Sequence, residues 1–299
     1  MFHGPVPSYH TSFINLPLAR LHVLETGTGM PLIMVPATIS ELENWRSLAQ
    51  FMAHWFHVYF FELPGHGGSE PFLERFSSQL VAGLVTQLVD ALGCPRFNLI
   101  GFSFGGILAM RTFRVLSSRI DRLLLLAPCL SYRALPYSAS RLSLLRQLNE
   151  FFGSPRLQDL LVGLFHDPRT ASATAHILQK IGRLEDSIPL REKLLRIRVS
   201  TVAVLNAQIR EILTTGFETA PTRYETPCYF AMSIHDPMLD FDTTERIMHE
   251  HFENISTLRL TYPFHQPPVP FTWEELTRDY YETVDSFVLS EAPIPVGSA

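Results

Sequence analysis

One serine of this chain lies between two glycines, at a point where the sequence pattern changes. The stretch reads Gly101-Phe102-Ser103-Phe104-Gly105-Gly106, with an apolar run (96–100) before it and a helix-like run (107–113) after it. A backbone that passes directly from a buried strand into a helix must turn tightly, and glycine avoids the clash that a Cβ would cause there. Such a turn holds the serine out at the edge of a sheet. The pattern therefore makes Ser103 a candidate nucleophile.

A serine hydroxyl is a weak nucleophile at neutral pH, so it needs an imidazole to accept its proton and a carboxylate to orient that imidazole. Asp236 follows a strand-like run, 229–233, and His265 follows the last such run, 256–262. Ligand sites of open α/β sheets form at the carboxyl ends of strands, where the order serine, acid, histidine is one known arrangement. We therefore predict a triad of Ser103, His265 and Asp236.

Two other aspartates compete with Asp236 for the role of the acid. Asp242 has capping-box spacing with Glu245, which predicts a helix cap, and Asp240 lies further along the loop. Asp236 is favoured because it comes directly after the strand.

A second cluster, His249-Glu250-His251, has ligand-type side chains but the wrong spacing for a metal site. Residues i and i+2 point to different faces of a helix, and the H-E-x-x-H pattern is absent. We interpret the cluster as a solvated helix face and predict no metal and no cofactor. Most of the 12 histidines are expected to be structural or exposed.

The elements that must position these side chains alternate between strand and helix. Apolar or alternating runs predict about eight strands, and the runs between them predict helices. The expected strands are 11–16, 20–26, 32–35, 57–61, 96–100, 120–127, 227–233 and 256–262. The alternation predicts an α/β fold with a mostly parallel sheet covered by helices on both faces.

Between the sixth and seventh strands, the chain has little strand signal and several helical runs. We expect a core formed by 1–130 and 226–299, with an inserted helical cap, or lid, over 131–225. The expected helices of the insertion are 142–152, 156–165, 170–181, 190–199 and 202–213. After the last strand, a final helix is expected from Thr272, which has capping-box spacing with Glu275, to about Leu289, followed by a loose tail over 292–299.

Taken together, these motifs resemble the α/β-hydrolase family along nearly the whole chain. The turn 62–69, Glu-Leu-Pro-Gly-His-Gly-Gly-Ser, is similar to the family's Asp-x-Pro-Gly-His-Gly-x-Ser, and Trp45 matches a tryptophan of the family. Besides Glu62, which replaces the Asp of that turn, three places differ from the family pattern. Pro36-Ala37-Thr38 replaces the usual His-Gly-x, and Ser233 and Phe264 stand where glycines are common.

The resemblance implies a role for each residue of the site. Ser103 would be the nucleophile, His265 the general base and then acid, and Asp236 its orienting partner. The oxyanion hole would be the backbone N–H of Phe104 with a second N–H from about Thr38. The first assignment also follows physically, because Phe104 begins a helix whose N-terminal amides favour negative charge.

Aromatic side chains near the serine and in the insertion are candidates for a substrate pocket. Phe102 flanks the nucleophile, whereas Phe152 and Phe165 belong to the insertion and could line a lid. Core packing is the alternative for each of them. An apolar lid would favour substrates with hydrophobic acyl or alcohol groups.

The expected function is hydrolysis of small carboxylic esters through an acyl-enzyme, as in a carboxylesterase. A carbon–carbon bond hydrolase or a peptidase of the same fold is the nearest alternative, and a non-catalytic ligand-binding member is a further one. Epoxide hydrolases and dehalogenases of the family carry aspartate at the position of Ser103, which disfavours them.

Composition sets the remaining expectations. The 299 residues are 46% hydrophobic with a net charge of −5, and basic runs are absent, which argues against a nucleic-acid partner. The three cysteines lack metal or redox spacing and are expected to be buried thiols in a reducing compartment. No run reaches the roughly 18 apolar residues that cross a bilayer, so we expect a cytoplasmic protein. The oligomeric state is not predicted.

Overall fold

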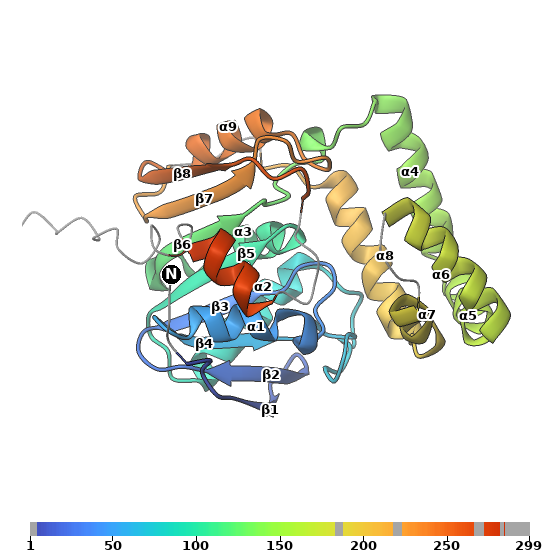
Figure 1. Cartoon of the computed structure of the whole chain (residues 1–299), viewed down its shortest axis with the longest axis horizontal. Helices are drawn as coiled ribbons and strands as arrows, with labels where there is room; N and C mark the ends of the chain where they lie inside the picture. The colour runs from blue at the N-terminus through green and yellow to red at the C-terminus, as the bar shows by residue number, and fades with distance from the viewer. Residues whose placement is uncertain (1–4, 183–187, 218–222, 266–271, 282–283, 285–299) are drawn as a thin grey trace, which may run out of the picture. The chain divides into compact units, whose positions relative to one another are not determined.

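The computed structural model describes residues 5–182, 188–217, 223–265, 272–281 and 284 (Figure 1). Its described residues fold as two compact units, one from Ser138 to Leu213 and one from the chain on either side of that segment. The first of these is all helical. The second contains a sheet with helices on both faces.

The sheet has eight strands in the order β1-β2-β4-β3-β5-β6-β7-β8. Strands β1 and β2 pair antiparallel, β2 pairs antiparallel with β4, and the remaining neighbours are parallel. The strands are β1 (Tyr9–Asn15), β2 (Arg20–Thr26), β3 (Pro31–Val35), β4 (His57–Phe61), β5 (Phe97–Phe102), β6 (Ile120–Leu126), β7 (Cys228–Ser233) and β8 (Ile255–Leu260). The predicted mostly parallel, eight-stranded sheet is confirmed.

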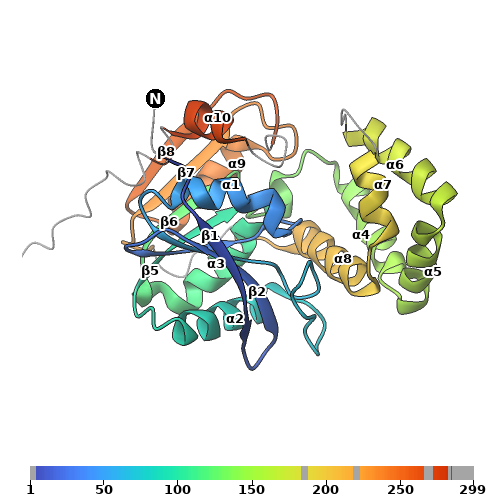
Figure 2. The ribbon, with the colours of Figure 1, turned by 60° about the horizontal axis from the view of Figure 1, so that its bottom comes forward.

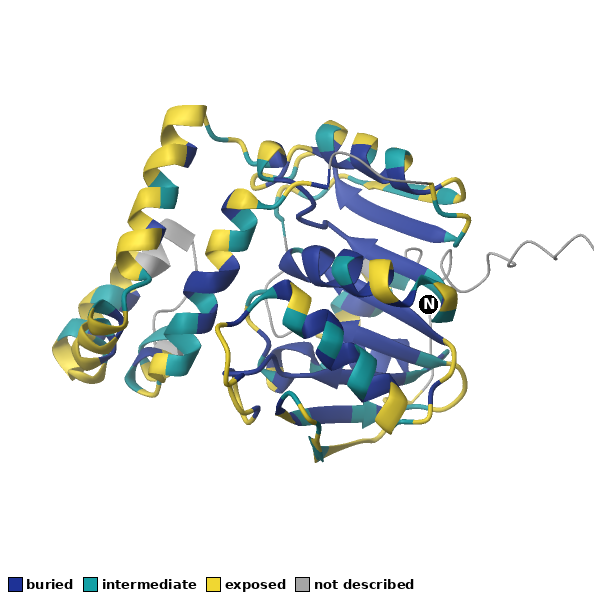
Figure 3. Ribbon diagram, turned by 180° about the vertical axis from the view of Figure 1, so that it is seen from behind, coloured by how far each residue is buried: buried dark blue, intermediate teal, exposed yellow. Residues whose placement is uncertain are grey.

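Helices cover both faces of this sheet. Helix α1 (Leu42–Met52) contacts the short α10 (Trp273–Glu275) on one face, and α2 (Ser78–Ala91) contacts α3 (Phe104–Leu116) on the other (Figure 2). Helix α9 (Phe241–His251) packs on β7 and β8. All six residues of β5 and of β7 are buried, as expected for central strands covered on both sides (Figure 3).

The two capping-box predictions had different outcomes. Thr272 and Glu275 form the predicted box at the start of α10. A π-helical turn (Leu276–Tyr280) follows, and the rest of the expected final helix and the expected loose tail lie outside the described residues, apart from Tyr281 and Val284. The prediction that Asp242 caps α9 is wrong. Asp240 is the cap, because its side chain accepts a hydrogen bond from the Thr243 N–H.

The helical unit has its own small core and its own polar links. Its helices are α4 (Ala139–Phe152), α5 (Pro155–His166), α6 (Pro168–Gly182), α7 (Ile188–Leu195) and α8 (Val199–Thr214), of which α8 ends one residue beyond the unit. Ala171, Ala175 and Leu194 form the buried centre. Asn206 on α8 donates to the Asn149 carbonyl oxygen of α4 at 2.8 Å. In the part of the chain that the structure describes, no helix is both long and apolar enough to cross a bilayer.

Candidate active site

Ser103 occupies a sharp turn between β5 and α3. Its backbone has φ 53° and ψ −117°, a conformation that side-chain-bearing residues rarely adopt. The turn is held by backbone hydrogen bonds, since Ser103 N–H donates to Leu126 at 3.0 Å and the Ser103 carbonyl accepts from Gly106 and Cys129 at 2.8 and 2.9 Å. The strain is therefore imposed by the surrounding sheet and helix, which present the hydroxyl at the strand's carboxyl end.

The glycines on either side of Ser103 allow this tight packing. A Cβ added to Gly101 would lie 2.4 Å from the carbonyl oxygen of Gly105. A Cβ added to Gly105 would lie 2.9 Å from the carbonyl oxygens of Val35 and Pro36. The second contact brings the start of α3 against the loop that follows β3, so this loop and the serine turn are directly packed together.

Ser103, His265 and Asp236 form one chain of hydrogen bonds. Ser103 Oγ lies 2.8 Å from His265 Nε2, and His265 Nδ1 lies 2.7 Å from Asp236 Oδ2. The Asp236 side chain is fully buried and that of His265 is 8% exposed. Because an ionised carboxylate accepts hydrogen bonds only, Nδ1 donates to it and Nε2 is left to accept the serine proton.

The other oxygen of Asp236 is held by its own loop. Oδ1 accepts the backbone N–H groups of Met238 at 2.8 Å and Leu239 at 3.0 Å. These two bonds fix the carboxylate in the orientation that places Oδ2 on the imidazole. Asp240 instead caps α9, so the two carboxylates of this loop have separate roles.

Ser233, one of the two departures from glycine in the sequence pattern, links the acid loop to the histidine loop. Its hydroxyl donates to the carbonyl oxygen of Tyr262 and accepts the His235 N–H at 3.1 Å. Asp236 comes three residues after Ser233, and His265 comes three residues after Tyr262. The hydroxyl therefore joins the bases of the two loops at the ends of β7 and β8.

Two backbone N–H groups near Ser103 are candidates for the oxyanion hole. Phe104 is the first residue of α3, whose helix dipole favours negative charge at that end. Thr38 lies in the loop that packs against Gly105, and Trp45 Nε1 donates to the next carbonyl in this loop, that of Ile39, at 2.7 Å. Among the described residues, neither the Phe104 N–H nor the Thr38 N–H has an acceptor in the protein.

The model of the alpha/beta hydrolase family matches residues 32–252. This is most of the chain, and it includes both the serine turn and the acid loop. The chain belongs to the alpha/beta hydrolase family. His265 lies beyond the matched residues, so its place in the site comes from the sequence pattern and from its contacts.

Curated relatives of this alpha/beta hydrolase act on different bonds. This chain is 27% identical over 119 residues to the pimeloyl-[acyl-carrier protein] methyl ester esterase of Nitrosomonas europaea. The aligned residues are 39% of this chain and 45% of that protein. It is 30% identical over 115 residues to the N-formylmaleamate deformylase of Pseudomonas putida, 38% of this chain and 42% of that protein. A soluble epoxide hydrolase of Corynebacterium sp. is 30% identical over 102 residues, 34% of this chain and 35% of that protein. The chain thus spans less than half of each of these relatives.

Solved structures resemble nearly the whole chain. A thermophilic esterase from Thermogutta terrifontis has a TM-score of 0.66 at 17% identity and covers 93% of this chain and 98% of its own. An N-formylmaleamic acid deformylase from Pseudomonas putida has a TM-score of 0.67 at 18% identity and covers 92% of this chain and 100% of its own. At such low identity these likenesses show the fold alone.

The four phenylalanines near the site or in the insertion have different surroundings in this hydrolase. The Phe102 ring is 5.7 Å from the rings of both Trp45 and His265, so it borders the imidazole. Phe104 is fully buried, and its ring packs against that of Phe76, with 6.5 Å between the ring centroids. In the helical unit, Phe152 is 40% exposed and Phe165 packs against the small core of that unit. The place of Phe102, Phe152 and Phe165 in a substrate pocket stays a prediction.

The His249-Glu250-His251 cluster differs from the sequence interpretation in one respect. His249 is exposed, but His251 is fully buried, so the prediction of a solvated face is wrong for that residue. His251 Nδ1 bonds to the Ile247 carbonyl at 2.9 Å, and Nε2 lies 3.2 Å from Arg114. Burial lowers the pKa of His251 below its usual value. No cluster with metal-ligand geometry is present among the described residues.

The cysteines are buried free thiols, as predicted. Cys129 donates its backbone N–H to the Ser103 carbonyl, so it is the nearest of the three to the serine along the hydrogen-bond network. Burial raises the pKa of Cys129 to about 12, which keeps it a thiol at neutral pH. It is therefore a packing residue beside the serine turn and not a competing nucleophile.

Proposed function

We propose that this chain is a serine hydrolase that cleaves carboxylic esters through an acyl-enzyme intermediate. The observation that supports this most strongly is the hydrogen-bonded chain from Asp236 through His265 to Ser103, in which the Asp236 side chain is fully buried. The His265 imidazole accepts the Ser103 proton while Oγ attacks the ester carbonyl carbon. The same imidazole then protonates the leaving alcohol, and a water molecule repeats the cycle to release the acid.

The negative charge that develops on the carbonyl oxygen requires preorganised donors. We assign this role to the N–H groups of Phe104 and Thr38, both of which lack an acceptor among the described residues. Losing one such donor costs roughly 3 kcal/mol of transition-state stabilisation. The reaction needs only these groups and the triad, and we propose that it uses no cofactor.

Exposed apolar side chains support a hydrophobic substrate. Ile39, Leu73, Ile234 and Met238 are all strongly exposed, and they lie in the loops that follow β3, β4 and β7 at the carboxyl edge of the sheet. Such residues in site-bearing loops favour esters with hydrophobic acyl or alcohol groups. We further propose that the helical unit is a cap, with Phe152 and Phe165 among the residues of the substrate pocket.

Ser103 also separates this site from some activities of its relatives. A serine that opened an epoxide would be left as an ether, which water does not hydrolyse, so an ester-forming carboxylate is needed for that chemistry. Removal of a formyl group is a second candidate, favoured by the N-formylmaleamate deformylase among the curated relatives. The triad serves acyl transfer from nitrogen as well as from oxygen. Carbon–carbon bond hydrolysis, peptide hydrolysis and non-catalytic ligand binding are the remaining alternatives.

The test is Ser103→Ala, assayed with p-nitrophenyl esters of short and long acyl chains. We expect a folded protein whose kcat is lower by on the order of 10⁴-fold or more, because the nucleophile is lost. Wild-type protein should be labelled covalently by a fluorophosphonate probe and the variant should not. Wild-type turnover in Ser103→Ala would contradict the proposed function. A panel of formamides, anilides and vinylogous diketones then separates ester hydrolysis from formyl removal, peptide hydrolysis and carbon–carbon bond hydrolysis.

A further inference from the structure

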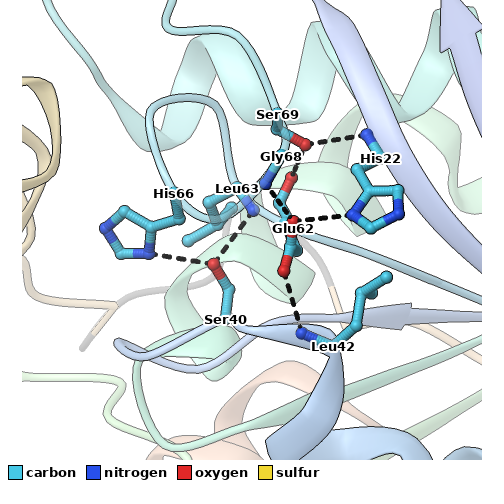
Figure 4. A network of polar contacts seen from close by, with 8 residues as sticks. All are labelled: His22, Ser40, Leu42, Glu62, Leu63, His66, Gly68 and Ser69. Carbon is cyan, nitrogen blue, oxygen red and sulfur yellow. Dashed lines mark hydrogen bonds and ion pairs between the residues drawn. The ribbon is translucent and has the colours of Figure 1, made fainter. Parts of the chain in front are cut away.

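The turn that follows β4 contains a buried carboxylate that the proposed reaction does not use. Glu62 is 4% exposed, and its two oxygens accept hydrogen bonds from three separate segments (Figure 4). Oε1 accepts the Leu42 N–H at 3.0 Å, and Oε2 accepts the Gly68 N–H at 2.5 Å and His22 Nδ1 at 3.0 Å. These charge-assisted bonds offset part of the cost of burying the carboxylate.

The turn is shaped around this carboxylate. Gly67 has a φ of +49°, and a Cβ there would lie 2.0 Å from Glu62 Oε2. Ser69 Oγ donates to the Glu62 carbonyl at 2.7 Å and accepts the His22 N–H at 2.9 Å. Glu62 is thus a central part of the turn, fixed from both its side chain and its backbone.

A second set of bonds connects the same turn to the loop after β3. Ser40 Oγ accepts the Leu63 N–H at 3.0 Å and shares a hydrogen bond of 2.9 Å with His66 Nδ1. Both Ser40 and His66 are buried. The turn therefore holds the loop at two points, Ser40 and Leu42 (Figure 4).

Thr38 lies just before these two points. On its other side, the carbonyls of Val35 and Pro36 pack against Gly105 beside the serine turn. The position of the Thr38 N–H relative to Ser103 is consequently set by anchors on both sides of it. A misplacement of about 1 Å in such a group can cost on the order of 10²-fold in rate.

We propose that Glu62 is a positioning residue that holds the loop between β3 and α1 (36–41), which we call the oxyanion loop. It does so through Leu42 and together with Ser40, so that the Thr38 N–H faces the carbonyl oxygen of the substrate. This inference rests on the proposed function. It assigns a role to a residue that stands where the family pattern has aspartate. The longer glutamate side chain reaches His22 on β2 and the start of α1 at the same time.

The experiment is Glu62→Gln, which keeps the shape of the side chain. Glutamine has one acceptor oxygen and an NH₂ group, so either the Leu42 N–H or the Gly68 N–H faces a donor instead of an acceptor. We expect kcat for a p-nitrophenyl ester to fall about 10-fold or more with little change in KM. The affinity for a trifluoromethyl ketone should fall by a similar factor, because its adduct with Ser103 places an oxyanion between the same N–H groups.

Glu25→Gln is the matched control. Glu25 lies on β2 like His22, and its carboxylate pairs with His57 at 2.7 Å and His10 at 3.1 Å, away from the oxyanion loop. It should leave both kcat and the affinity for the ketone unchanged. An equal loss in Glu25→Gln would overturn the proposal, because it would show that any broken carboxylate–histidine pair of this sheet lowers activity.

Ser40→Ala provides a second route to the same loop if Glu62→Gln does not fold. It removes the acceptor of the Leu63 N–H and should lower kcat and ketone affinity in parallel. A folded Glu62→Gln protein with wild-type kcat and wild-type ketone affinity would overturn the inference. If Glu62→Gln does not fold, the same result in Ser40→Ala would overturn it. Ser103→Ala distinguishes this from failure of the proposed function, since turnover in that variant removes the serine mechanism regardless of Glu62.

Discussion

Ser103 adopts a positive φ at the end of β5, and the glycines beside it are required by space as much as by backbone freedom. The Gly105 position is the more informative of the two. A side chain there would meet the backbone carbonyls of Val35 and Pro36, which cannot rotate away as a side chain can. The glycine thus lets two parts of the candidate site pack directly against each other.

We expect Gly105→Ala to lower both stability and activity. The added Cβ would lie 2.9 Å from two backbone oxygens, so the loop or the start of α3 must shift. Overpacking of this kind costs about 1–3 kcal/mol, and a displaced loop should lower kcat as well. Urea unfolding and ester hydrolysis measure the two effects.

Gly163→Ala is the control for this substitution. Gly163 lies in α5, and a Cβ there would have nothing within 4 Å. Because alanine is a better helix former than glycine by about 1 kcal/mol, this variant should be at least as stable as wild type and fully active. Wild-type stability and activity in Gly105→Ala would show that the close approach to Val35 and Pro36 is not a constraint.

At the scale of the element, the loop between β7 and α9 shows how neighbouring carboxylates acquire different roles. Asp236 accepts hydrogen bonds from its own loop and from His265, and its side chain is buried. Asp240, four residues later, is exposed and accepts the Thr243 N–H at 2.8 Å as the cap of α9. Local geometry, and not the residue type, separates a site residue from a capping residue.

This separation predicts opposite effects for two substitutions. Asp236→Asn should lower kcat by about 10⁴-fold, because the imidazole loses the carboxylate that fixes its tautomer, and the protein should remain folded. Asp240→Ala should lower the free energy of unfolding by about 1 kcal/mol through the lost cap and leave kcat close to wild type. The measurements are steady-state ester hydrolysis and urea unfolding. A large loss of activity in Asp240→Ala with none in Asp236→Asn would show that Asp236 is not the acid of the triad.

At the scale of the whole molecule, the stability of the fold depends on the buried His251, which lies between Asp236 and His265 in the sequence but is not part of the triad. His251 on α9 faces Arg114 of α3, with the Phe217 and Phe252 rings close by, and the Glu250 charge acts to raise its pKa. Its Nε2 lies within hydrogen-bond distance of the Arg114 guanidinium, which only donates, so the imidazole is neutral when folded. Burial lowers the pKa of His251, and the Arg114 charge lowers it further, while the Ile247 carbonyl opposes this.

The lowered pKa of His251 predicts a loss of stability in acid. Below the ordinary histidine pKa of about 6.5, the unfolded chain binds a proton at this residue that the folded chain does not, so the free energy of unfolding falls as pH falls. The contribution of one such group is at most about 1.4 kcal/mol per pH unit and ends below the folded-state pKa. Above the ordinary histidine pKa, His251 is neutral in both states and the free energy of unfolding no longer changes with pH through this residue.

His251→Gln should therefore have a shallower pH dependence of stability than wild type between about pH 5 and 7. Urea unfolding across this range measures it. Burial also lowers the pKa of His54, but that residue is present in both proteins and cancels in the difference. Identical slopes would show that His251 is not a buried neutral group in the folded state.

Much of the fold could be predicted from local patterns. The apolar run of the strand before Ser103 is continuous in sequence, and the apolar side chains of α2 recur at helical spacing. The alternation of such strands and helices along the chain indicates a mostly parallel sheet. The serine turn could be predicted because the steric requirement for Gly101 and Gly105 is local. The sequence does not distinguish Asp240 from Asp242 as the cap of α9, because the two lie within two residues of each other and sequence patterns place helix ends only approximately.

The sequence by itself determined which residue types follow which strands, and hence the candidates Ser103, Asp236 and His265. Only the tertiary structure decided that Ser103 and His265, 162 positions apart, lie within a hydrogen bond of each other. It also decided that the Glu62 carboxylate accepts hydrogen bonds from His22 and Leu42, and that His251 is buried against Arg114. The physical reason is that these contacts depend on strand order and register, which bring distant segments together and which no local run of residues encodes.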